Sequence, residues 1–131
     1  MIHTAEHREL IEPLLLKQGL DPLILEVVDD VADRSTQLGY PDANPFRLAR
    51  SIRRPAGESF ILISSQITDD MVESAKSAMT LRGFSDEVQR LSTNEAFLTH
   101  LVLHEVAAFV LRTAEQEPRD RWAFQQMDCS R

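Results

Sequence analysis

The chain of 131 residues carries 43% apolar and 27% charged side chains, and its formal net charge is −7. These values are typical of one globular domain over residues 1–131 and argue against a disordered chain. The acidic balance disfavours nucleic acid as a partner, because binding along a phosphate backbone needs a basic surface.

Neither a membrane span nor an export signal is expected. No apolar run reaches the roughly 18 to 20 residues that a bilayer requires, and the first residues lack the basic start and apolar stretch of a signal peptide. The one cysteine, Cys129, excludes an intrachain disulfide and fits a reducing compartment. We therefore expect a cytoplasmic protein without membrane contact.

Cap residues and apolar spacing predict a mainly helical chain. Asp21 followed by Pro22 is a strong helix start, and Gly39 is placed to end that helix. Pro45 is expected to open a short helix that carries four arginines, and Thr68 to cap the next helix. Helices are predicted, in chain order, over residues 4–16, 21–38, 45–54, 68–82, 92–116 and 119–127.

The predicted helix over 92–116 is the longest element and is apolar on nearly all sides, which is typical of a buried central helix. Ser92 and Glu95 resemble a capping box at its start, and Pro118 is expected to end it. Residues 60–63 are the one clear strand candidate, apolar on both faces and therefore predicted to lie centrally in a small sheet. The fold class is α+β, predominantly helical, with a long buried helix and one to three strands.

The four histidines form two pairs with i, i+4 spacing, His3 with His7 and His100 with His104. On a helix this spacing places two imidazoles on one face, where they can bind one metal ion. The first pair lies near the terminus among charged neighbours and is expected to be solvated. The second pair lies inside the buried helix, and it is therefore the candidate for a site.

Glu105 follows His104 directly and lies among apolar residues, without a cation on its own helix to neutralise it. A buried carboxylate needs a partner, because an unpaired charge in an apolar interior is costly. An arginine, a hydrogen-bond network or a metal-bound water could meet it. Ordinary polar packing in the protein interior and a remnant of a catalytic centre both remain open at this point.

Two segments resemble the small prokaryotic zincin-type metallopeptidases, including the ImmA/IrrE-like group. Residues 102–111 are similar to the HExxH motif of that group, with Ala108 where the second histidine belongs, and residues 115–124 are similar to the segment that follows it. The zincin-like part spans about residues 92–127. The strand over 60–63 would then stand for the sheet edge along which such enzymes place substrate.

The resemblance implies that His104 is a zinc ligand and that Glu105 is the general base. It also implies that Glu117 or Glu115 is an acidic ligand. Ala108 removes a ligand that a catalytic zinc site requires, and ordinary peptidase turnover should be lost with it.

A displaced site is a second interpretation of the same helix. His100 and His104 could share a metal with an acid from Glu115, Glu117 or Asp120. The favoured ligand set is His104, Glu117 and His100, with zinc bound weakly or not at all. We expect such a site to be structural, because the metal would lie a helical turn away from Glu105.

Three functions follow from these residues. The first is a degenerate zincin-like domain that is non-catalytic and binds a protein partner through the former substrate groove. The second is an active or deliberately inactivated zinc peptidase. The third is a helical, acidic interaction or inhibitor module without metal. The first two require a cleft and a sheet edge beside Glu105, and a carboxylate clamped by an arginine with neither feature would remove the peptidase lineage.

Overall fold

The computed structural model describes residues 1–19, 23–42, 44, 47–55 and 58–129. Its main sheet contains β2 (Leu23–Val28), β4 (Ser59–Ser64) and β3 (Ala49–Ile52) in the order β2-β4-β3. Strand β2 pairs with β4 in parallel, and β3 pairs with β4 antiparallel. A smaller sheet joins β1 (Ile2–His3) to β5 (Gln66–Ile67). The predicted α+β class is confirmed.

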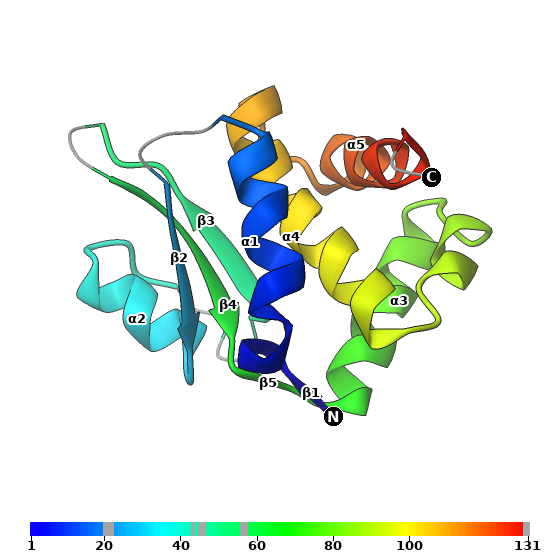
Figure 1. Cartoon of the computed structure of the whole chain (residues 1–131), viewed down its shortest axis with the longest axis horizontal. Coiled ribbons are helices and arrows are strands. Elements are labelled where there is room, and N and C mark those ends of the chain that lie inside the picture. Colours follow the sequence, from blue (N-terminus) through cyan, green and yellow to red (C-terminus); the bar gives the residue numbers. More distant parts are fainter. Residues whose placement is uncertain (20–22, 43, 45–46, 56–57, 130–131) are drawn as a thin grey trace.

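Helices cover both faces of the main sheet (Figure 1). One face carries α2 (Val31–Gln37), and the other carries α1 (Arg8–Lys17) and α4 (Asn94–Leu111). The described residues also form η1 (Thr4–His7), α3 (Asp69–Leu81), η2 (Glu87–Arg90) and α5 (Gln116–Cys129). Helix α4 lies between the sheet and α5, so it is the central helix that the sequence predicts.

Strand β4 is the centre of the core, as its apolar run predicts. Ile61, Leu62 and Ile63 are each 0% exposed, because both faces of a central strand are covered. Side chains alternate along the strand: Ile61 and Ile63 pack in the cluster that contains α1 and α4, and Leu62 packs in the cluster that contains α2. The alternation of side chains along β4 therefore determines which helices pack on each face of the sheet.

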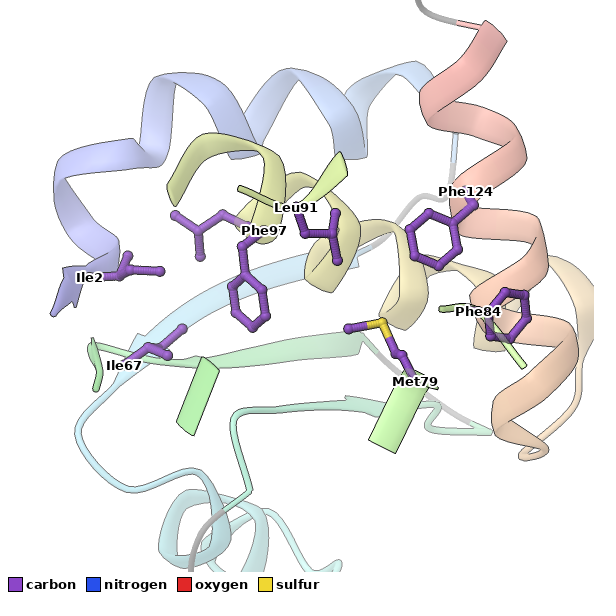
Figure 2. Packing of buried hydrophobic residues seen from close by; sticks show 8 residues of the cluster. Ile2, Ile67, Met79, Phe84, Leu91, Phe97 and Phe124 are labelled. Atoms are coloured by element: carbon purple, nitrogen blue, oxygen red, sulfur yellow. The ribbon is translucent and has the colours of Figure 1, made fainter. Parts of the chain in front are cut away.

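A third cluster connects α3, α4 and α5 with the small sheet (Figure 2). Its members on the helices include Phe97 of α4, Met79 of α3 and Phe124 of α5, and each of these three is at most 3% exposed. Phe84 extends the cluster, and its ring centroid lies 5.6 Å from that of Phe124. This packing holds α5 against α4, and it thereby brings the polar residues of the two helices together.

The predicted helix over 21–38 is wrong in its first part, because residues 23–28 form strand β2 and only Val31–Gln37 is helical. The apolar spacing suits both structures, and residue-by-residue pairing with β4 decides for the strand. Asp30, whose carboxylate accepts from the Asp33 N–H at 2.9 Å, is the actual N-cap. The predicted cap at Asp21 and Pro22 lies outside the described residues.

Two further element predictions need correction. The arginine-rich segment forms strand β3 instead of a helix, since its residues 49–52 pair with β4; Pro45 lies outside the described residues. The helix predicted over 92–116, with a capping box at Ser92 and Glu95, is shorter. Helix α4 starts after Thr93, whose hydroxyl accepts from the Ala96 N–H at 3.1 Å, and it ends at Leu111 because Arg112 adopts φ 53°. The expected N-cap at Thr68 and the helix that follows it, Asp69–Leu81, are confirmed.

Among the described helices, none is by itself long and apolar enough to cross a bilayer. Only α4 and α5 together meet that criterion, and they are bent by 115° relative to each other.

Candidate functional site

Glu105 is clamped between two elements. It is 5% exposed, and its Oε2 accepts hydrogen bonds from Arg119 Nη2 at 2.9 Å and from the Ser51 hydroxyl at 2.8 Å. Arg119 Nε also donates to the carbonyl of His104 at 3.1 Å. The partner that a buried carboxylate requires is therefore an arginine from α5, assisted by a serine from β3.

The electrostatics of this carboxylate follow from its contacts. Burial raises the pKa of Glu105, but the adjacent His104, the Arg119 charge and the Ser51 hydroxyl outweigh burial and lower the pKa to about 2. Glu105 is consequently ionised at neutral pH and a weak base. A general base that works near neutral pH needs a pKa much closer to that pH.

A second polar group lies on the other side of His104. Nε2 of His100 and Nε2 of His104 lie 3.6 Å and 3.5 Å from Oδ1 of Asp120. Arg82 holds the other carboxylate oxygen, Oδ2, through Nε at 2.7 Å and Nη2 at 2.6 Å. His100 and Asp120 are buried, at 3% and 1% exposure, and the His104 side chain is 12% exposed.

Three atoms in this group lack a hydrogen-bond partner, namely Nε2 of both imidazoles and Oδ1 of Asp120. Unsatisfied buried polar atoms are rare in folded proteins, and each calls for a physical explanation. Burial lowers the pKa of His100 to about 3, and the neighbouring His104 and Arg82 add to this shift. His100 is therefore neutral at pH 7, with one ring nitrogen bearing a lone pair.

The structure brings together three of the predicted site residues, His100, His104 and Glu105, but it places Glu117 elsewhere. Glu117 lies on the exposed first turn of α5 and pairs with Arg121, and Glu115 is exposed as well. Asp120, the third acid considered in the sequence, is the one beside the imidazoles. One helical turn separates it from Glu117, and the sequence offered no signal to choose between them.

The zinc site that the zincin resemblance implies does not fit these residues. Ala108 lines a hollow together with Ser51, Arg53 and Arg119, so it faces guanidinium groups. No group of three or more His, Cys, Asp or Glu side chains, within the described ranges, surrounds a metal position as the side chains stand. A ligand set of His104, position 108 and Glu117 is therefore not assembled.

Two hollows border strand β3, which is an edge strand of the sheet. One has a volume of about 530 Å³ and is lined by Ala49, His104 and Glu105 among others, with α3 on its opposite wall. The other has a volume of about 360 Å³ and contains Ser51 and Arg119. A cleft and a sheet edge thus accompany the arginine clamp, and the edge belongs to β3, because β4 is central.

The other histidine pair does not share a helix face. His3 belongs to strand β1 and is exposed, whereas His7 lies at the end of η1. The i, i+4 spacing therefore has no geometric consequence there. This pair provides a natural control for the buried one.

Three residues of the site, Ser51, Arg82 and Arg119, carry no signal in the sequence that marks them as site residues. Ser51 lies more than 50 residues before Glu105 in a segment predicted as a helix, so only the strand pairing brings it close. Arg82 was predicted as the end of a helix, which it follows directly. The sequence indicates that Glu105 needs a partner, but it leaves open an arginine, a hydrogen-bond network or a metal-bound water.

Comparison of the chain with protein-family models, with curated proteins and with solved structures finds no match.

Restoring a histidine at position 108 tests the zincin assignment. We expect Ala108→His to add no equivalent of zinc and no cleavage of casein, because the new imidazole enters the hollow that contains Arg53 and Arg119. Zinc content by mass spectrometry and fluorogenic casein hydrolysis check this. An additional zinc equivalent together with casein cleavage would establish the peptidase lineage that the sequence resembles.

Proposed function

We propose that this protein is a degenerate, non-catalytic zincin-like domain that binds an extended segment of a protein partner along the edge of β3. The single observation that carries the proposal is that Arg119 and Ser51 both donate hydrogen bonds to the Glu105 carboxylate. A carboxylate that neutralises a buried guanidinium is not free to activate water. The resemblance of residues 102–111 to a peptidase motif supports a peptide as the ligand.

The hollows along β3 support a ligand that is longer than a single side chain. The hollow of about 530 Å³ borders the first residue of the strand, Ala49, and the hollow of about 360 Å³ borders Ser51 and Arg53. Glu105 lines the first hollow and Arg119 the second, so their ion pair lies between them. A segment that follows the strand would cross this pair and use both hollows.

The backbone of β3 offers hydrogen bonds to such a segment. Ser64 N donates to the carbonyl of Leu48 at 2.8 Å, which makes this a hydrogen-bonded pair of the antiparallel ladder. Because such pairs alternate, the backbone groups of Ala49 and Ser51 point away from β4. Addition of a strand at a free sheet edge is a common mode of peptide recognition.

The chemistry of the lining suggests which segment fits. Leu48, Met71 and Leu101 give the larger hollow apolar walls. Arg53 and Arg112 line the smaller hollow. We therefore expect an extended segment with apolar residues at one end and an acidic residue at the other.

Selection of peptides from a random 12-residue library displayed on phage, followed by binding titration, tests the proposal. We expect Ala49→Pro to lower the affinity for the selected peptides at least tenfold, because proline removes an outward-pointing N–H. The variant should still fold, because proline is tolerated at a sheet edge. Amide exchange measured by NMR should show protection of Ala49 and Ser51 when peptide is bound.

The matched control is Val27→Pro, on the opposite edge of the same sheet. Ser65 N donates to the carbonyl of Val28 at 2.7 Å, so the parallel ladder directs the Val27 backbone away from β4. Val27→Pro should retain full peptide affinity. If no peptide is enriched, or if enriched peptides bind the Ala49→Pro protein as tightly as the unchanged chain, binding along β3 is wrong.

A further inference from the structure

The three polar atoms without partners point to one common centre. Nε2 of His100, Nε2 of His104 and Oδ1 of Asp120 are buried, and the carboxylate oxygen lies within 3.6 Å of both nitrogens. The two imidazoles come from successive turns of α4, and the carboxylate comes from α5. Each of the three atom types is an established ligand of a divalent transition metal.

We propose that His100, His104 and Asp120 form a zinc site that connects α4 with α5. This site differs from the one that a zincin motif implies, because it uses the turn before His104 and not the turn after it. It also does not depend on the peptide-binding proposal, since the metal and the β3 edge involve different atoms and different measurements.

Glu105 orients one of the proposed ligands, His104, as carboxylates orient the histidine ligands of known metal sites. Nδ1 of His104 lies 3.5 Å from Oε1 of Glu105, so the carboxylate faces that nitrogen and leaves Nε2 directed at Asp120. A ligating histidine commonly presents its second nitrogen to a carboxylate in this way. Arg82 holds Oδ2 of Asp120, and Oδ1 remains available.

Each distance from an imidazole Nε2 to Oδ1 of Asp120 is close to that between two ligands of one ion. Two ligands at zinc bond lengths in tetrahedral geometry are about 3.3 Å apart, and each Nε2 lies 3.5 or 3.6 Å from Oδ1. The two ring centroids are 6.1 Å apart with an interplanar angle of 29°, which is too wide for a closed site as the rings stand. Tilting both rings toward Asp120 would close it.

The site has room for an ion and a further ligand. A cavity of about 110 Å³ adjoins it and is lined by His100, His104 and Asp120 together with Ala75 and Ala78 of α3. His104 also lines the hollow of about 530 Å³, so an ion could enter from there. Three protein ligands would leave the fourth zinc position for water from this cavity.

The test uses the full chain, first stripped of metal and then titrated with Co²⁺, whose visible absorption reports tetrahedral coordination, and with Zn²⁺ by calorimetry. We expect one equivalent of each metal to bind. His100→Gln and Asp120→Asn should each weaken zinc binding at least tenfold, since each variant removes one of only three protein ligands.

The double variant His3→Gln/His7→Gln is the matched control, because it removes the other histidine pair of identical spacing. It should bind zinc as the unchanged chain does. Circular dichroism verifies that each variant folds, and His100→Gln decides the question if Asp120→Asn does not fold. Absence of stoichiometric metal binding in the unchanged chain, or retention of full affinity in the folded His100→Gln protein, would overturn the proposal.

Discussion

Replacing Glu105 with glutamine is expected to destabilise the fold by about 3 to 5 kcal/mol, which is the range for breaking a buried ion pair by removing one partner. Arg119 would remain buried, at 7% exposure, without a counter-charge. The Ser51 hydroxyl would also lose its charged acceptor. Chemical denaturation monitored by circular dichroism measures the change.

The matched control for Glu105→Gln is Glu117→Gln. Glu117 pairs with Arg121 across one turn of α5, but both side chains of that pair are more than half exposed. An exposed i, i+4 pair contributes about 0.3 to 0.5 kcal/mol, so this variant should remain close to the unchanged chain. A similar loss of stability in both variants would mean that the buried Glu105–Arg119 pair contributes no more to stability than the exposed Glu117–Arg121 pair.

Replacing Arg82 with methionine is expected to destabilise the metal-free protein by about 3 kcal/mol, because Asp120 would keep its buried charge without its guanidinium partner. The same change should tighten zinc binding. Arg82 and a metal ion would both draw on the Asp120 carboxylate, and removal of the guanidinium also removes a positive charge beside the ion. The rise in melting temperature on adding zinc should therefore be larger in Arg82→Met than in the unchanged chain.

Arg90→Met provides the control for this second prediction. Arg90 donates to Asp128 at 2.6 Å, and this pair also connects the segment after α3 with α5 across 38 residues of sequence. Its side chains are 35% and 50% exposed, so its loss should cost less than about 1 kcal/mol. If zinc stabilises Arg82→Met and Arg90→Met equally, Asp120 is not a ligand.

The sequence predicts the elements whose signals are local. The apolar run of β4 is long enough to predict a central strand, and Thr68 followed by two acidic residues predicts the start of α3. The apolar surround of His104 correctly predicts a buried helix. In each case the signal lies within the element itself.

The remainder depends on contacts between distant segments. Residues 23–28 carry apolar residues at spacings that suit either a helix or a strand, and only the partner strand β4 decides between them. The same dependence conceals the serine beside Glu105, because Ser51 reaches it through strand β3. The choice of Asp120 over Glu117 depends on how α5 rotates against α4, which the packing of Phe124 and Met79 determines.

The central claim is that the Glu105 carboxylate serves to neutralise Arg119, and a double-mutant cycle on the two residues tests it most directly. The unfolding free energies of the unchanged chain, Glu105→Gln, Arg119→Met and the double variant give the coupling between the two side chains. We predict a coupling of at least about 2 kcal/mol, with the double variant more stable than Glu105→Gln alone. A coupling below about 0.5 kcal/mol would contradict the claim, because such a value is typical of independent sites.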